Sequence, residues 1–230
     1  MEFSKSELTD CVVLSQGSNA TASVIWLHGL GADGHDFVPI VPELRLPGQL
    51  AIRFVFPHAP LRAVTINNGY VMRAWYDVKL SGLQGGSEDE LGIRQSETLL
   101  RTYVQKEIDA GIPAARIVIA GFSQGGAIAL HSALRYPQRL AGVMALSTYL
   151  PLRGVLATEA ANANKDIPIL LCHGTHDAVV PLTLGDTSRD VLQRLGYAVT
   201  WKQYPLAHEV SMPQVGDIST WLQERLPSRS

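Results

Sequence analysis

The 230-residue sequence is poor in cysteine and has no long apolar run. Cys11 and Cys172 are not spaced like metal ligands, so we expect two reduced, buried thiols rather than a metal site or a disulfide scaffold. The longest apolar runs, such as 167–172, are far too short to span a bilayer, and Pro168 interrupts that one. These absences argue against stable membrane insertion.

Charge of one sign is also scarce, because 19 basic residues face 21 acidic ones and the formal net charge is −2. No basic cluster is dense enough to hold a polyanion, so we expect no nucleic-acid partner. Residues 1–7 lack the basic start and apolar run of a secretory signal. The sequence therefore predicts a cytoplasmic protein.

Apolar residues, at 46%, are instead plentiful and fall into short runs between longer segments of helical period. Several runs are continuous rather than alternating, which is typical of strands buried on both faces of a mostly parallel sheet. We therefore predict an α/β fold with helices on both faces of that sheet. The expected strands are Cys11–Leu14, Ser23–Leu27, Ile52–Phe56, Arg116–Phe122, Gly142–Leu146, Ile169–His173 and Val199–Tyr204.

Helix signals separate these runs. Ser87 and Glu90 have the spacing of a capping box, which predicts a helix from Ser87 that ends at Gly111. A second helix is expected over 183–195, closed by Gly196, and a last one begins near Pro213.

One stretch, 61–86, shows no helical period. Asn67-Asn68-Gly69 predicts a tight turn there, between strands over 63–66 and 70–76. We expect an ordered hairpin at 61–86 within a single domain spanning 1–230.

The motif Gly-Phe-Ser-Gln-Gly at 121–125 matches the G-x-S-x-G nucleophile elbow. The motif alone is frequent by chance, and its context gives it weight. A convincing strand precedes it, and the small-residue segment 126–130 that follows can start a helix packed closely on the sheet. Ser123 is therefore the predicted nucleophile.

A serine hydroxyl needs a base to accept its proton. His131 lies about two turns along the helix that follows Ser123 and cannot fold back onto it, whereas His173 ends a strand and His176 lies in the loop after it. His208 occupies a loop between the last strand and the last helix, which is the position this fold requires of the base. Since His208 must be neutral to accept a proton, we expect activity to rise through about pH 6 to 7.5.

The base in turn needs an acid to orient it. Asp177 follows the strand 169–173 in a short turn, between the serine and the histidine in chain order. Asp186, Asp190 and Asp217 lie within helices and are interpreted as surface charges. The sequence predicts a Ser123, Asp177 and His208 triad that acts by two-step acyl transfer.

An oxyanion hole needs two N–H donors. The backbone of Gln124, at a helix N-terminus, is the first. The loop His28-Gly29-Leu30-Gly31 follows the strand 23–27, and we assign the backbone of Leu30 as the second. His28 precedes the serine and is interpreted as a structural hydrogen-bonding residue.

Several blocks together resemble one family. They are W-L-H-G-L-G-A-D at 26–33, F-P-H-A-P at 56–60, G-F-S-Q-G-G at 121–126, Leu146-Ser147 with Leu150-Pro151, and His173-Gly174 with Asp177. From about Val24 to the last helix they are similar to the carboxylesterase and acyl-protein thioesterase (lysophospholipase-like) family of α/β-hydrolases.

The resemblance implies a cofactor-free and metal-free serine hydrolase of short-to-medium acyl esters or thioesters that forms weak homodimers. It also implies that no large cap domain is present and that the excursion at 61–86 shapes the substrate site, with substrate contacts from Trp75, Leu80, Tyr149 and Val180. Eukaryotic thioesterases of the family have Trp at the position of Tyr149, which leaves the acyl-length preference open. Ala207 stands where glycine is usual, and its methyl group requires a negative φ.

Other functions stay open on sequence alone. A dienelactone hydrolase is disfavoured by the serine nucleophile, and a serine peptidase by the compact length without a cap domain. A non-catalytic binding protein that kept the fold would carry no reactive Ser123.

Overall fold

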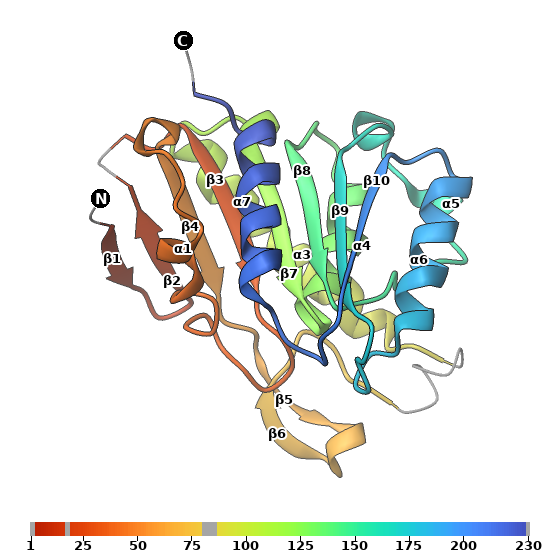
Figure 1. Ribbon diagram of the computed structural model, residues 1–230. Coiled ribbons are helices and arrows are strands. Elements are labelled where there is room, and N and C mark those ends of the chain that lie inside the picture. Colours follow the sequence, from red (N-terminus) through yellow and green to blue (C-terminus); the bar gives the residue numbers. More distant parts are fainter. Residues whose placement is uncertain (1–2, 17–18, 80–86, 229–230) are drawn as a thin grey trace.

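A computed structural model describes residues 3–16, 19–79 and 87–228. Its centre is an eight-stranded sheet in the order β1-β2-β4-β3-β7-β8-β9-β10 (Figure 1). From β4 to β10 along this order the neighbours are parallel, and β1 and β2 add an antiparallel edge. The strands are β1 (Ser4–Glu7), β2 (Cys11–Ser15), β3 (Ala22–Leu27), β4 (Ile52–Pro57), β7 (Ile117–Phe122), β8 (Gly142–Leu146), β9 (Ile169–Gly174) and β10 (Val199–Tyr204).

Helices cover both faces of the sheet. In Figure 1, α1 and α7 lie in front of it and α3 and α4 behind it. The helices are α1 (Ile40–Glu43), α3 (Glu90–Asp109), α4 (Gln124–Arg135), α5 (Leu156–Glu159), α6 (Leu182–Arg194) and α7 (Met212–Arg225), with short 3-10 turns at Gly48–Leu50, Thr65–Asn67, Ala114–Arg116 and Asn162–Asn164. The predicted α/β-hydrolase fold, with a mostly parallel sheet, is confirmed.

Two apolar cores form on the two faces. Alternate residues of β3 enter each, with Ile25 and Leu27 facing α3 and α4 and Val24 and Trp26 facing α1 and α7. Because every residue of β3 is buried, the strand carries apolar side chains on both faces, as the continuous apolar run predicts.

The seven strands expected for the main sheet all form, with ends shifted by one residue at most. The edge strand β1 was not expected, because its residues are exposed and polar. The capping-box prediction is wrong: Asp89, not Ser87, is the N-cap of α3, and its Oδ1 accepts the N–H of Gly92 at 3.0 Å. Asp89 Oδ2 also accepts the N–H of Asp77, so the same carboxylate ties the helix start to the segment before it.

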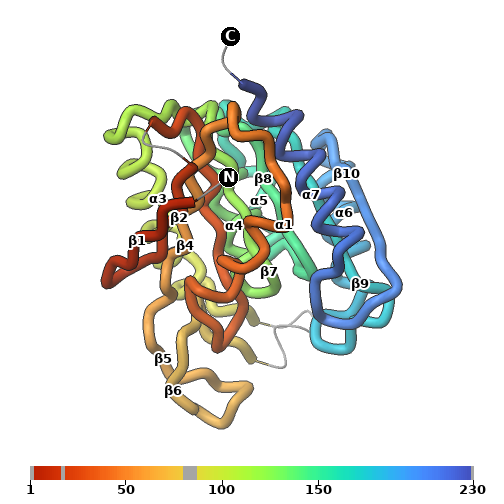
Figure 2. The backbone as a smooth tube through the Cα atoms, turned by 60° about the vertical axis from the view of Figure 1, so that its left-hand side comes forward, coloured from red at the N-terminus to blue at the C-terminus, as the bar shows by residue number. Residues whose placement is uncertain are grey.

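The predicted hairpin is formed by β5 (Leu61–Val64) and β6 (Tyr70–Arg73). The first strand lies two residues earlier than expected because a 3-10 turn occupies Thr65–Asn67, and the second ends at Arg73 rather than at Tyr76. Asn68 and Gly69 turn the chain with φ of 56° and 76°. Figures 1 and 2 both show this hairpin projecting beyond the carboxyl ends of the parallel strands. Residues 80–86, and with them Leu80, lie outside the described residues.

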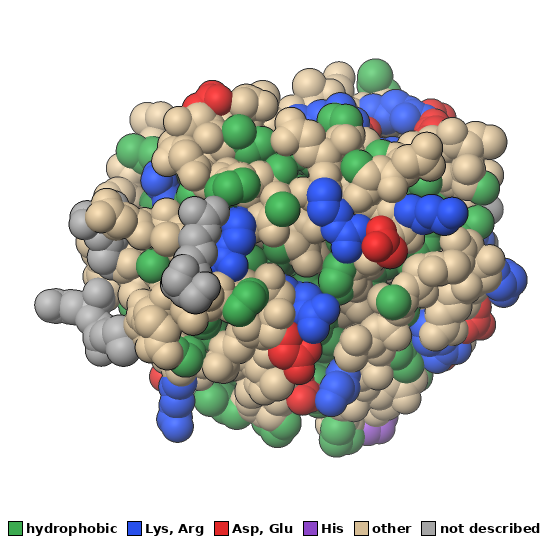
Figure 3. All heavy atoms as spheres, turned by 90° about the horizontal axis from the view of Figure 1, so that it is seen from above, with side chains coloured by type: hydrophobic (Ala, Val, Ile, Leu, Met, Phe, Trp, Pro, Cys, Tyr) green, Lys and Arg blue, Asp and Glu red, His purple; other side chains and the backbone are tan. Residues whose placement is uncertain are grey.

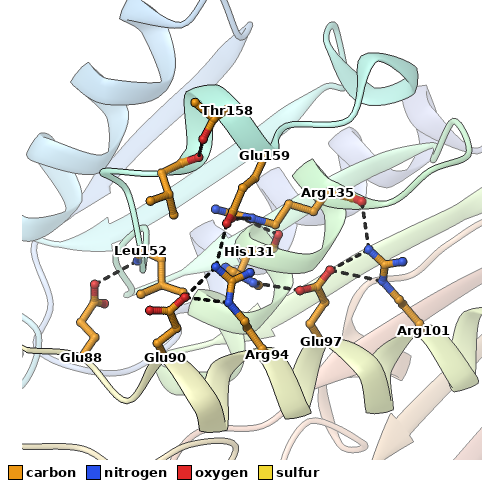
Figure 4. A network of polar contacts seen from close by, with 11 residues as sticks. Glu88, Glu90, Arg94, Glu97, Arg101, His131, Arg135, Leu152, Thr158 and Glu159 are labelled. Atoms are coloured by element: carbon orange, nitrogen blue, oxygen red, sulfur yellow. Dashed lines mark hydrogen bonds and ion pairs between the residues drawn. The ribbon is translucent and has the colours of Figure 1, made fainter.

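A network of ion pairs joins α3 to α4 and α5 (Figure 4). Arg94 of α3 and Arg135 of α4 both pair with Glu159 of α5, at 2.7 Å each. One turn further along α3, Glu97 pairs with the wholly buried His131 of α4 at 3.0 Å. The network therefore fixes α4, the helix that follows Ser123, against its neighbours.

The end of the molecule opposite the hairpin is shown in Figure 3, where Lys and Arg side chains lie scattered among hydrophobic, acidic and other side chains. Cys11 and Cys172 are free and buried, as expected. Through the described ranges, no helix combines the length and apolarity that crossing a membrane requires.

Candidate active site

Ser123 lies on a sharp turn between β7 and α4. Its backbone has φ 52° and ψ −121°, a combination that a residue with a side chain adopts only when its surroundings enforce it. Its N–H donates to Leu146 O at 2.8 Å, and its carbonyl oxygen accepts from Thr148 Oγ1 at 2.6 Å. Strand β8 and the loop after it thus hold both sides of the strained turn.

The flanking glycines are required by close backbone contacts. A Cβ on Gly121 would lie 2.3 Å from the backbone carbonyl of Gly125, and a Cβ on Gly125 would lie 2.5 Å from the carbonyl oxygen of His28. Both distances are far below those that real side chains tolerate. The turn is therefore packed against the loop after β3 on one side and against its own helix on the other.

Asp177 and His208 are in direct contact. Nδ1 of His208 donates to Oδ2 of Asp177 at 2.7 Å, and the Asp177 side chain has no exposed surface. The other carboxylate oxygen accepts the N–H groups of Val179 and Val180 at 2.9 and 2.8 Å. A carboxylate held at both oxygens fixes the ring orientation and leaves Nε2 of His208 as the proton acceptor.

Close packing of two loops creates this contact. A Cβ on Gly174, at the end of β9, would lie 2.3 Å from the carbonyl oxygens of Leu206 and Ala207. Backbone hydrogen bonds hold the same loops together, since His176 N–H donates to Leu206 O at 3.0 Å. Ala207 does not have a positive φ among the described residues, which meets the requirement of its methyl group.

The imidazole of His208 also rests against the residue before the nucleophile. The rings of Phe122 and His208 have centroids 4.7 Å apart and planes inclined at 43°. Sequence reasoning missed this contact, because Phe122 is the unconstrained position of G-x-S-x-G. The contact brings the loop that carries His208 next to Ser123.

The two predicted oxyanion donors lie in adjoining segments. The first turn of α4, with Gln124, packs against the backbone of His28 through Gly125. In the loop after β3, Gly31 N–H donates to Arg73 O at 2.9 Å and Ala32 N–H donates to Gly29 O at 3.3 Å. Leu30 lies directly before these two bonded amides, and its oxyanion role stays a prediction.

His28 is a structural residue, as interpreted from the sequence. Its Nε2 accepts the N–H of Ala59 at 3.0 Å, and its Nδ1 donates to the carbonyl oxygen of Gly29 at 2.7 Å. Burial lowers the pKa of His28 to about 4, because the interior disfavours the charged ring. A neutral imidazole with both nitrogens engaged cannot serve as the base for Ser123.

The side chain of Gln124 has a second task that the sequence did not reveal. Its Oε1 accepts the N–H of Trp75 at 2.8 Å, and its Nε2 donates to the carbonyl oxygen of Tyr76 at 2.7 Å. The indole N–H of Trp75 donates to His28 O at 2.9 Å. The segment after the hairpin is thus bonded directly to both segments that hold the predicted oxyanion donors.

Comparison with known proteins shows which family this chain is similar to. The sequence profile of the phospholipase/carboxylesterase family matches residues 8–226. The chain is 42% identical over 217 residues to acyl-protein thioesterase 1 of Neurospora crassa, covering 90% of this chain and 88% of that protein. It is 38% identical over 210 residues to acyl-protein thioesterase 1 of Yarrowia lipolytica, covering 90% and 92%.

The chain belongs to the phospholipase/carboxylesterase family. It is therefore a serine hydrolase of acyl esters, and the resemblance read from its sequence is confirmed. Solved structures agree: Arabidopsis thaliana SOBER1 superposes with a TM-score of 0.84 at 33% identity, covering 89% of this chain and 99% of that one. Zea mays acyl-protein thioesterase 2 has a TM-score of 0.82 at 30% identity, covering 94% and 98%.

Three of the residues expected to contact substrate lie within the described ranges, and they differ in how much of their surface is exposed. Tyr149 is half-buried, donates or accepts a hydrogen bond at 2.9 Å with the hydroxyl of Tyr76, and lines a small cavity with it. Val180 is 5% exposed and serves mainly to hold the Asp177 carboxylate through its N–H. Trp75 is 0% exposed, so it offers a bound acyl chain no surface in this conformation.

The remaining buried histidines have structural partners. His131 is paired with Glu97, and burial is the main cause that lowers its pKa. His173 Nε2 donates to Val180 O at 2.8 Å and lies 3.7 Å from Asp177 Oδ2, so it supports the turn that carries the acid. Across the described residues, no group of His, Cys, Asp or Glu side chains is arranged to hold a metal ion.

Proposed function

We propose that this chain hydrolyses acyl esters and thioesters through an acyl-enzyme on Ser123, with His208 as base and Asp177 as its orienting acid. The observation that carries the proposal is the 2.7 Å hydrogen bond from His208 Nδ1 to the buried Asp177 carboxylate. It supports a His208 tautomer whose free Nε2 accepts a proton. Ser123 has a strained backbone and directly follows Phe122, whose ring contacts His208. Both observations support Ser123 as the donor of that proton.

Acylation begins when Nε2 of His208 takes the hydroxyl proton of Ser123 while Oγ attacks the acyl carbonyl carbon. The carbonyl oxygen becomes an oxyanion, for which the backbone N–H groups of Leu30 and Gln124 are the proposed donors. Gln124 is the first residue of α4, so the helix dipole also favours the negative charge there. Collapse of the intermediate expels the alcohol or thiol, which receives the proton from His208.

Deacylation repeats these steps with water. His208 removes a proton from the water as its oxygen attacks the acyl carbon, and a second tetrahedral intermediate forms. Its collapse releases the carboxylic acid and returns the proton to Oγ of Ser123. In both steps Asp177 stays ionised and stabilises the imidazolium of His208.

Acyl-protein thioesters are part of the proposal, beside short-to-medium acyl esters, because relatives of 42% and 38% identity are named acyl-protein thioesterase 1. A panel of substrates with acyl chains from two to sixteen carbons, each as an oxygen ester and as a thioester, tests it. A kcat/KM for the thioesters that equals or exceeds that for the matched oxygen esters supports this substrate class. Turnover confined to the oxygen esters contradicts the thioester part of the proposal, while leaving the acyl-enzyme mechanism standing.

Covalent labelling tests the nucleophile. A fluorophosphonate probe should add once to the intact protein, and Ser123→Ala should abolish the adduct. Ser132→Ala, on the same helix, is the matched control and should keep it. An adduct that survives in Ser123→Ala, or no adduct on the unaltered chain, would contradict the proposal.

The acid is tested with Asp177→Asn. The substitution keeps the shape but favours the wrong tautomer of His208, so kcat should fall by roughly 10³- to 10⁴-fold. Asp190→Asn, a surface carboxylate paired with Arg189, is the control and should change little. Equal activity of the two variants would remove Asp177 from the site.

Two further proposals from the sequence concern the setting of the enzyme. We propose a weak homodimer, on the strength of the family resemblance, and a cytoplasmic location, on the strength of two free buried thiols. Sedimentation equilibrium over a hundredfold range of concentration tests the first. Fractionation of cells that express the full chain tests the second.

A further inference from the structure

We propose that Phe122 is a positioning residue for the reaction: its aromatic ring stabilises the imidazolium that His208 forms in the transition state and holds that ring in place. The proposal rests on the triad of the proposed function and assigns a role to a residue outside it. The geometry that carries it is the 4.7 Å separation of the Phe122 and His208 ring centroids.

The Phe122 ring is held from several sides. The ring of Phe37 packs against it with centroids 5.6 Å apart, and Trp26 stacks on Phe37 at 5.0 Å. Gly29, in the loop of the oxyanion donors, packs against its edge, since a Cβ there would be 3.3 Å from Cδ1 of Phe122. One side chain therefore contacts both the loop after β3 and the imidazole of His208.

Such a contact has a defined electrostatic effect. The face of an aromatic ring carries negative partial charge, and a cation within about 6 Å of the ring centroid is attracted to it. His208 is neutral before the reaction and becomes a cation when it takes the proton of Ser123. The attraction is therefore larger in the transition state than in the ground state, which is the condition for a faster reaction.

Phe122 is uncharged, and the charged groups around the His208 imidazole lie on other elements than β7. Among the described residues, the Asp177 carboxylate is the charged group in hydrogen-bond contact with His208, from the loop after β9. His173 lies 3.7 Å from the same carboxylate, on the side of the buried turn. Phe122 faces His208 from β7, while Glu209 in the loop of His208 itself is exposed. Removing the ring of Phe122 leaves these groups unchanged.

The experiment compares the pH profile of kcat/KM for the unaltered protein with two variants. Phe122→Leu keeps an apolar side chain without the ring, and replacement of Phe122 by pentafluorophenylalanine keeps the ring shape but reverses the charge of its face. Both should lower the plateau of kcat/KM by about 3- to 10-fold and move the midpoint of the acid limb by about half a pH unit to lower pH.

The direction of the midpoint shift separates the proposal from simple misplacement. Loss of the negative face makes the protonated ring less stable, so His208 loses its proton at lower pH. A lower plateau with an unmoved midpoint in both variants overturns the proposal, because a ring that only fills space accounts for it. Unchanged profiles overturn it as well.

Failure of this proposal is distinguishable from failure of the proposed function. Fluorophosphonate labelling of Ser123 and the loss of activity in Asp177→Asn test the triad and do not depend on the ring of Phe122. Where Phe122→Leu folds poorly, shown by its thermal midpoint, the fluorinated protein decides the outcome, since its side chain keeps the shape of phenylalanine.

Discussion

A Cβ on Gly174 would lie 2.3 Å from the carbonyl oxygen of Ala207, so the end of β9 and the loop that carries His208 pack backbone against backbone. This contact links the two elements from which Asp177 and His208 come. Because Gly174 has no side chain, these two elements can approach closely enough for Asp177 and His208 to form their hydrogen bond.

The substitution Gly174→Ala should push the His208 loop away from Asp177. A displacement of about 1 Å at a catalytic group costs about 10²-fold in rate, so kcat/KM should fall by that order. Steady-state kinetics on one ester substrate measures the effect. The matched control is Gly154→Ala, where no described atom lies within 4 Å of the added methyl group, and full activity of Gly174→Ala would refute the packing argument.

Gln124→Met should destabilise the fold, and the cause lies in the side chain rather than in the oxyanion hole. The substitution leaves the N–H of Trp75 and the carbonyl oxygen of Tyr76 buried without partners. Each unsatisfied group costs about 1–3 kcal/mol, so the free energy of unfolding should fall by roughly 2–6 kcal/mol. Urea unfolding measures it, and a loss below 1 kcal/mol would show that the two groups find other partners.

Stability should decrease as the pH falls from neutrality. Burial lowers the pKa of His28 from 6.5 to about 4, so the unfolded chain binds more protons than the folded one between these values. The contribution is fully present above pH 6.5 and is lost toward pH 4, by about 2 kcal/mol between pH 7.5 and 5. His131, whose pKa burial also lowers, adds a change of the same sign.

Urea unfolding at pH 7.5 and at pH 5 isolates the share of His28 through the variant His28→Asn. The variant is less stable at both values, but its loss on acidification should be smaller by about 2 kcal/mol. His176→Asn, in an exposed loop position, is the control and should keep the full loss. An equal loss in His28→Asn and the unaltered chain would mean that His28 does not carry this pH dependence.

Two glycines in helices should respond to alanine in opposite ways. Gly216, on the exposed face of α7, has no described atom within 4 Å of an added Cβ, so Gly216→Ala should raise stability by about 0.5–1 kcal/mol. In α6, a Cβ on Gly185 would lie 2.6 Å from Nδ1 of His173, so Gly185→Ala should lower stability by roughly 1–3 kcal/mol. Thermal unfolding measures both, and changes of the same sign would contradict the contact argument.

The sequence by itself determined the order and type of the main elements. Continuous apolar runs such as 23–27 predict strands buried on both faces, and all the expected strands form. It also singled out Ser123, Asp177 and His208, since chain order and loop position leave one histidine and one aspartate for the roles. Local pattern suffices here, because a buried parallel strand and a strand-to-helix turn have local signatures.

Short or exposed elements escaped this reasoning. Strand β1 is polar and exposed, so pairing with β2 rather than apolar patterning creates it. The cap of α3 is Asp89 rather than Ser87 because its carboxylate serves Asp77 and Gly92 together, and the first of these contacts comes from a distant segment. Competing caps two residues apart differ only through such tertiary bonds.

Only the tertiary structure decided which residues support the site. The contact of Phe122 with His208, the clamp of Gln124 on Trp75 and Tyr76, and the close approach of Gly174 to Ala207 join segments far apart in the chain. Trp75 is also buried in the tertiary structure, where its indole N–H donates to the backbone carbonyl oxygen of His28. These relationships follow from packing among loops, for which a single sequence carries no periodic signal.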